Sequence, residues 1–405
     1  EDATPDDIAA MAELAREGIE AGALGFTTSR TRNHKTSTGA YTPTLTAAPD
    51  ELIGIAQGVG ATGTGVLQVV SDFLDPDGEF QMLREMVATS GRPMSISIAR
   101  NPMVPDAFRG LLDQITRANA DGLTMTGQVA PRAVGLILGL ECTLNPFLTN
   151  PVHREIADLP LAERVAALRD GEIRSRLLAE ATERSRDKLG GNLISRFDLL
   201  FEMGDEPDYE PSLDTSIAAV AARRGVTPEE VALDVMLADD GHGLIYLPFL
   251  NYVDGNLDGC HEMLTHPHTV PGLADGGAHV GTICDGSFPT TLLAYWGRDR
   301  DHDRIPLPFL VKRHCRDTAR TVGLLDRGVI APGYRADLNV VDFDRLRLHK
   351  PTIVHDLPAK GRRLLQRAEG WRHTIVAGQE TYHDGTATDA LPGRLIRGAQ
   401  PAPKG

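Results

Sequence analysis

The segment 270–285 concentrates residue types that could carry chemistry. Apolar residues 270–274 lead to Asp275, two glycines follow, and His279 lies four residues after the aspartate. Active sites of α/β sheets and barrels lie at the carboxyl ends of strands. A carboxylate delivered there could act as a general base or bind a metal ion. The alternative is a strand that ends in a tight turn capped by Asp275, and the segment alone leaves both interpretations open.

Arginine follows three of the segments that we expect to be strands, as Arg30, Arg100 and Arg132, and Gln128 precedes the last of them. If these strands are parallel, the arginines share one edge of the sheet. Guanidinium groups bind carboxylates through two parallel hydrogen bonds, which would suit a substrate carboxylate. Solvated arginines in surface loops are the alternative.

A second histidine pair is a weaker candidate. His266 and His268 have the spacing that can bind one metal ion from a strand, but Pro267 lies between them. Proline is poorly suited to a central strand. We therefore expect a loop after a helix, in which His266 interacts with the helix dipole.

These residues must be positioned by an alternation of helices and strands. A capping pattern at Thr4 and Asp7 predicts that the chain opens with a helix. The expected helices that follow are 49–59, 79–89 and 106–120, and the expected strands are 24–29, 66–70, 94–98, 123–129 and 270–274. This spacing predicts βαβ units and a parallel sheet, in either a doubly wound fold or a barrel.

The rest of the chain has a different texture. Residues 142–240 are charged and helical in pattern, with a second capping box at Thr227 and Glu230, and they indicate a helical insertion. A further strand is expected at 244–247. Within residues 331–405, the sequence predicts β-strands at 336–343 and at 374–377, the second of which precedes a turn at a glycine.

Composition excludes several classes of protein. The 405 residues include 41 Lys or Arg and 56 Asp or Glu, a net charge of −15, which disfavours binding to nucleic acid. No apolar run approaches the roughly 18 residues of a membrane helix. The four cysteines are scattered, which indicates a reducing, cytoplasmic location. Because the chain begins with Glu1, we expect a processed chain or a fragment.

Several motifs resemble those of the D-aminoacylase branch of the amidohydrolase superfamily. The chain resembles a divergent, actinobacterial-type member of that branch. These motifs are residues 22–29, 275–279, 288–290, 316–319 and 326–341. The last of them is the most specific. The resemblance implies a partial (β/α)₈ TIM barrel in residues 1–330, holding about strands 4 to 8, with the insertion at 142–240. Residues 331–405 would form the C-terminal part of a small β-sandwich and a tail.

The resemblance also implies a function. We expect a metal-dependent hydrolase of linear amide C–N bonds, similar to an N-acyl-D-amino-acid deacylase, with a small-molecule amide as substrate. Asp275 would be general base and metal ligand, and His279 would polarise the amide or orient Asp275. Arg30, Arg100, Gln128 and Arg132 would bind the substrate.

The chain departs from the family pattern in its metal ligands. The family's H-x-H pair is absent, Gln68 is the polar residue of the expected fifth strand, and Ile98 stands where the sixth would supply a histidine. We expect one divalent ion, zinc, bound mostly by residues upstream of Glu1, and no activity from this chain alone. The alternatives are hydrolysis of a cyclic amide or another C–N bond, and a non-catalytic relative that binds a small molecule.

Overall fold

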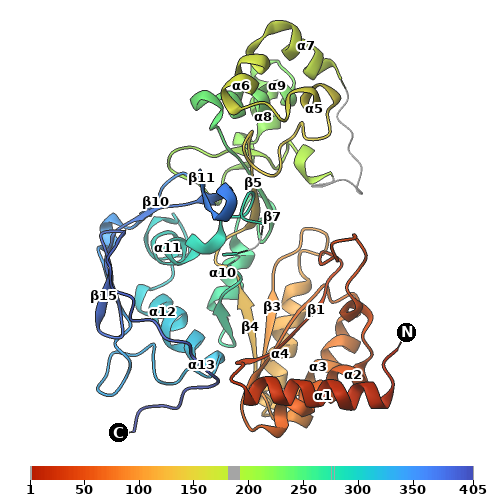
Figure 1. Ribbon diagram of the computed structural model, residues 1–405, viewed down its shortest axis with the longest axis vertical. Coiled ribbons are helices and arrows are strands. Elements are labelled where there is room, and N and C mark those ends of the chain that lie inside the picture. Colours follow the sequence, from red (N-terminus) through yellow and green to blue (C-terminus); the bar gives the residue numbers. More distant parts are fainter. Residues whose placement is uncertain (1, 181–191, 275, 278, 405) are drawn as a thin grey trace.

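A parallel five-stranded sheet forms the centre of the N-terminal region in the computed structural model, which describes residues 2–180, 192–274, 276–277 and 279–404. The strands, in spatial order, are β1 (Gly25–Arg30), β2 (Val66–Ser71), β3 (Met94–Ile98), β4 (Met125–Val129) and β8 (Thr269–Pro271). All four neighbouring pairs are parallel, and β1 and β8 are the open edges. Figure 1 shows β1, β3 and β4 of this sheet, and β2 lies between β1 and β3. This order is consistent with the predicted partial barrel.

Helices cover one face of this sheet. They are α1 (Pro5–Glu20), α2 (Pro49–Ala61), α3 (Pro76–Ser90) and α4 (Ala107–Ala120). The expected capping box at the start of α1 is present, because Thr4 and Asp7 bond reciprocally through side chain and backbone. The apolar residues of the strands, such as Leu67, Val69 and Ile96, are fully buried in the core that these helices share.

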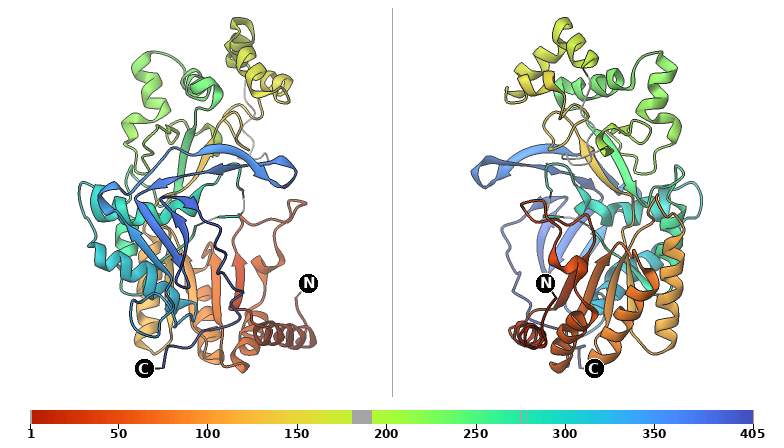
Figure 2. Two further views of the ribbon diagram at one scale, coloured as in Figure 1. Left: turned by 60° about the vertical axis from the view of Figure 1, so that its left-hand side comes forward. Right: turned by 90° about the vertical axis from the view of Figure 1, so that its right-hand side faces the viewer.

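Between β4 and β8 the chain forms a second region. Its antiparallel sheet has the order β5 (Val134–Leu138), β7 (Ile245–Leu250) and β6 (Phe201–Glu202). Its helices are α5 (Pro151–Ile156), α6 (Leu161–Arg169), α7 (Gly171–Ala179), α8 (Ile217–Arg224) and α9 (Pro228–Leu237). They surround a hydrophobic core of their own, and Figure 2 shows them as a cluster apart from the parallel sheet.

The structure refines two expectations in this insertion. The helical pattern around residues 162–180 is two helices, because Asp170 has an extended backbone and its carboxylate accepts the first backbone N–H groups of α7. The strand expected at 244–247 is β7, which pairs with β5 and β6 rather than with the parallel sheet. The capping box at Thr227 and Glu230 is present at the start of α9.

After the insertion, the chain returns to the parallel sheet through α10 and continues in helices. These are α10 (Asp258–Thr265), α11 (Phe288–Ala294), α12 (Leu307–Lys312) and α13 (Thr318–Thr321), with π-helical turns η6 (Tyr295–Asp299) and η7 (Arg313–Asp317). Short 3₁₀ turns are η1 (Pro43–Thr46), η2 (Leu193–Ser195), η3 (Leu213–Thr215), η4 (Asp239–Gly241), η5 (Asp285–Ser287), η8 (Phe343–Arg345) and η9 (Pro358–Lys360).

The C-terminal region is rich in β-structure, as its pattern predicts. Its largest sheet is antiparallel, in the order β16 (Thr386–Ala387), β15 (Gln379–His383), β14 (Trp371–Val376) and β9 (Leu338–Val341). Two antiparallel pairs accompany it, β10 (Arg347–Leu348) with β13 (Ala368–Glu369) and β11 (Thr352–Leu357) with β12 (Gly361–Leu365). Whether these strands form a sandwich stays a prediction.

Candidate active site

The face of the parallel sheet opposite the helices carries hydroxyl and amide groups. Thr27 Oγ1 donates to Gln68 Oε1 from the neighbouring strand, and Gln68 Nε2 donates to Ser97 Oγ at 3.2 Å. On the next pair of strands, Gln128 Nε2 donates to Ser95 Oγ at 2.5 Å. These contacts cross four strands. They form a polar row that could bind an amide, which both donates and accepts hydrogen bonds.

Strand alternation explains this row and corrects one expectation. Successive residues of a strand point to opposite faces, so Ser95 and Ser97 lie on the polar face while Ile96 and Ile98 point to the helices. Ile98 is 1% exposed and belongs to the helix-covered core. Ile98 therefore does not occupy a position where a site histidine would stand. The polar-face residues of β3 are the two serines.

The segment after β8 carries the predicted catalytic pair. Asp275 lies outside the described residues, so its predicted role stays a prediction. His279 is exposed and has a left-handed backbone with φ of 52°. The loop that follows is held by Thr282, whose backbone and hydroxyl both bond Ile137 of β5, and by Val280, whose carbonyl accepts from Leu364 N at 2.7 Å. These bonds anchor the loop to β5 and to the C-terminal region.

Arg132 follows β4 and holds the end of the same loop. Its guanidinium group is 3% exposed and bonds Asp285 Oδ1 and the Cys284 carbonyl, both at 2.7 Å. It also lies 4.0 Å from the centre of the Tyr209 ring. Burial disfavours the charge of Arg132, but Tyr209 and Asp285 outweigh it and raise the pKa. A substrate carboxylate would have to replace these partners, and the predicted binding role stays a prediction.

Cys284 is the cysteine whose backbone carbonyl accepts a hydrogen bond from Arg132. Burial raises the pKa of its thiol to about 11. A thiol with so high a pKa is protonated at neutral pH and is a poor nucleophile. This argues against thiolate chemistry at Cys284.

The other two predicted arginines also have partners within the protein. Arg30 Nη1 donates to the Ala47 carbonyl at 2.9 Å, and Arg30 Nε lies 3.6 Å from Glu79 Oε1 of α3. Arg100 Nη2 donates to Asp254 Oδ2 at 3.2 Å. Arg30 is the last residue of β1 and Arg100 follows β3, so both lie at carboxyl ends of parallel strands, and their role toward a substrate stays a prediction.

Asn251 joins the ends of β3 and β4, and the sequence alone did not reveal it. Its side chain accepts from Arg100 N at 2.8 Å and donates to the carbonyls of Ala130 and Arg132, each at 3.2 Å. It is fully buried, with φ of 68°. Asparagine tolerates this backbone region better than most residues. That tolerance is the only local signal that could have identified it.

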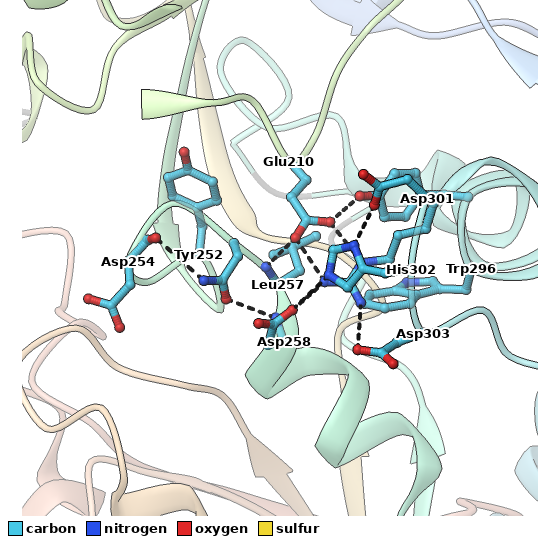
Figure 3. A network of polar contacts seen from close by, with 12 residues as sticks. Glu210, Tyr252, Asp254, Leu257, Asp258, Trp296, Asp301, His302 and Asp303 are labelled. Carbon is cyan, nitrogen blue, oxygen red and sulfur yellow. Dashed lines mark hydrogen bonds and ion pairs between the residues drawn. The ribbon is translucent and has the colours of Figure 1, made fainter. Parts of the chain in front are cut away.

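A buried ion network supports the loop that follows Asn251 (Figure 3). Glu210 from the insertion accepts from Arg300 Nε at 3.1 Å, from Arg300 Nη2 at 3.0 Å and from Leu257 N at 2.6 Å. Arg300 Nη2 also donates to Asp258 at the start of α10. Arg300 is 1% exposed. The network therefore ties the insertion to α10, whose chain leads directly into β8.

The described residues at the strand ends do not make up a metal site. Among residues 2–180, 192–274, 276–277 and 279–404, groups of three His, Cys, Asp or Glu with ligand atoms within 4.8 Å of one another occur twice. They are His373 with Glu380 and His383, and Asp258 with His302 and Asp303. Neither group contains a residue of the parallel sheet.

His266 and His268 lie where the sequence predicts. His266 caps the carboxyl end of α10, and its Nε2 lies 3.1 Å from Thr116 Oγ1. Arg313 donates to the carbonyls of His266 and Pro267. The two histidines thus belong to a loop that packs against α4 and η7.

Across the described residues, no helix is long and apolar enough to cross a membrane.

Comparisons with known proteins give the family and the fold. The sequence model of the amidohydrolase family matches residues 1–382 of this chain. Uncharacterized proteins of Mycobacterium bovis and Mycobacterium tuberculosis are each 29% identical over 204 residues, 46% of this chain and 32% of theirs. The match thus spans about a third of each relative.

Two solved structures of D-aminoacylase resemble the chain with TM-scores of 0.54 and 0.52, at 18% and 20% identity. Each likeness covers 98% of this chain and 66% of the other. At such identity the likeness supports the fold alone. The first of these structures is described as having a binuclear metal center, with activation by one metal and attenuation by the second.

Proposed function

Because the chain belongs to the amidohydrolase family, we propose that its protein hydrolyses amide C–N bonds at the carboxyl ends of β1, β2, β3, β4 and β8. The observation that carries the proposal is the open parallel sheet, whose polar face bears the row from Thr27 to Gln128. In the sequence, Asp275 follows the end of β8 by four residues.

In this proposal Asp275 is the general base that accepts a proton from the attacking water and then delivers it to the departing amine. His279 would polarise the amide carbonyl or orient Asp275. Arg132, just after β4, holds the segment that follows His279 through Asp285 and the Cys284 carbonyl. The substrate class we propose is an N-acyl amino acid, of D configuration by the resemblance to D-aminoacylase.

The family and the D-aminoacylase structures support a dependence on a divalent metal, and we propose zinc. Such an ion supplies an acidified water when it is bound. The described residues at the strand ends do not fit a complete ligand set. No step of the mechanism is therefore assigned to the ion.

The experiment compares N-acetyl-D-leucine, N-acetyl-L-leucine and the cyclic amide hydantoin as substrates of the intact protein, with and without added Zn²⁺. We expect the D substrate to be hydrolysed fastest. Asp275→Asn should lower kcat at least about 100-fold, the scale of general acid–base catalysis. Asp50→Asn, which changes an exposed carboxylate of α2, is the matched control and should retain activity.

One observation favours a second function. The polar row on the sheet consists of amides and hydroxyls, groups that bind a ligand without hydrolysing it. A metal-loaded protein that binds N-acetyl-D-leucine and turns over none of the three compounds would replace the hydrolase with a small-molecule binder. Preference for hydantoin would instead place it among cyclic-amide hydrolases.

A further inference from the structure

Three potential metal ligands meet on β14 and β15, remote from the polar row. His373 Nδ1 lies 2.6 Å from Glu380 Oε1, and His383 Nδ1 lies 2.9 Å from the same oxygen. The two imidazole centres are 4.8 Å apart. Figure 1 shows β15 at the side of the molecule away from β1.

A β-bulge brings these residues to one face. His373 and His383 are cross-strand partners and therefore share a face of the sheet. In a regular strand Glu380, three residues before His383, would point to the opposite face. The register instead moves from Thr374 opposite Tyr382 to Ile375 opposite Glu380, which leaves one extra residue on β15. That residue turns Glu380 to the side of both histidines.

Two tight turns hold this arrangement. Ala377 and Gly378 join β14 to β15 with φ of 50° and 79°, and Asp384 and Gly385 join β15 to β16 with φ of 44° and 76°. Two-residue turns with positive φ at both positions match the twist of the strands that they connect. The backbone beneath the cluster is therefore ordered before any ligand binds, which lowers the entropy cost of binding.

We propose that His373, Glu380 and His383 form a binding site for a divalent transition-metal ion of the zinc class, separate from the proposed active site. Two imidazole nitrogens and one carboxylate oxygen are a ligand set that zinc accepts, with water in the remaining position. Zinc–ligand distances near 2.0–2.1 Å imply ligand atoms about 3.3 Å apart in a tetrahedron. From their present distances of 2.6 Å and 2.9 Å, the two histidine–carboxylate contacts would lengthen by only about 0.7 Å and 0.4 Å.

The surroundings suit a cation. The side chains of His373, Glu380 and His383 are 38%, 39% and 58% exposed, so an ion can reach them from solvent and they can adjust. The nearest basic side chain on these strands, Arg372, is bound to Asp342 and Asp384.

The group of Asp258, His302 and Asp303 is a weaker candidate. Arg300 donates to Asp258 and approaches Asp303, so a positive charge already occupies that position (Figure 3). A second cation there would be repelled. Among the described residues, no Arg or Lys side chain forms an ion pair with the cluster on β14 and β15.

The site can be tested by isothermal titration of the metal-free intact protein with Zn²⁺, and by the visible absorption of bound Co²⁺. We expect the double variant His373→Ala/His383→Ala to bind one equivalent fewer than the wild type, and Glu380→Gln to weaken that site at least tenfold. His355→Ala, which removes a half-exposed histidine from β11, is the matched control and should leave the titration unchanged.

Folding is monitored separately by circular dichroism, and Glu380→Gln, which preserves side-chain shape, remains informative if the double variant is unstable. Zn²⁺ should raise the Tm of the wild type more than that of either variant. An unchanged stoichiometry and affinity in both variants would overturn the proposed site. Because these measurements do not involve turnover, a failure of the proposed amide hydrolysis would not affect them.

Discussion

Acidification should destabilise the insertion through His153, a residue of α5. His153 is 3% exposed, and neither ring nitrogen has a hydrogen-bond partner among the described residues. Burial, assisted by the positive charge of Arg164, lowers the pKa of His153 from 6.5 to about 4. In the folded protein the imidazole therefore stays neutral at a pH where the unfolded chain binds a proton.

The sign and size of the effect follow from this difference. Above about pH 6.5, His153 is neutral in both the folded and the unfolded state, and it does not lower the free energy of unfolding. Between pH 6.5 and pH 4 the unfolded state takes up a proton that the folded state refuses, so stability falls as the pH falls. Each tenfold difference in proton affinity is worth about 1.4 kcal/mol, so the loss reaches about 3 kcal/mol near pH 4 and then levels off.

Hydrogen exchange of the α5 amides measures this directly as the free energy of opening at several pH values. His153→Leu has a similar volume and no titratable group, and it should remove about 3 kcal/mol of the pH dependence of α5. Val152→Ala, a buried neighbour in the same helix, should lower the opening free energy equally at every pH. If His153→Leu and the wild type lose stability in parallel, the assignment of the effect to His153 is refuted.

Three further outcomes are expected. Asn251→Ala should cost about 3 kcal/mol in urea unfolding, because three buried hydrogen bonds are lost at a left-handed backbone position; a loss below about 1 kcal/mol would contradict the joining role. Gly25→Ala should lower the Tm, because the added Cβ would lie 2.0 Å from the Val66 carbonyl oxygen. Gly18→Ala in α1 adds a Cβ that meets no atom within 4 Å, and it should stabilise the protein by about 0.5–1 kcal/mol. Equal effects of the two substitutions on the Tm would refute the steric argument. Arg132→Lys should raise KM for N-acyl amino acids more than for the corresponding amides if the guanidinium binds the substrate carboxylate; equal losses on both would assign Arg132 to holding the loop alone.

Local patterns were sufficient for much of the fold. The capping boxes at Thr4 and Thr227 and the bounds of β3 depend on residues within a few positions of one another, and the structure has them where the sequence predicts. The parallel sheet followed from the spacing of strands and helices, because a βαβ unit needs a connection of that length. The strand expected at 270–274 is β8, which runs from Thr269 to Pro271, so the sequence located this strand but not its end.

The tertiary structure alone decided which side chains meet. Arg132 and Asp285 are separated by 153 residues, and Asn251 and Arg100 by 151, so no local pattern could pair them. The face of Ile98 depends on where β3 places its alternation against the helices. The cluster of His373, Glu380 and His383 depends on one extra residue in β15, because a shift of one position moves a side chain to the other face of a sheet.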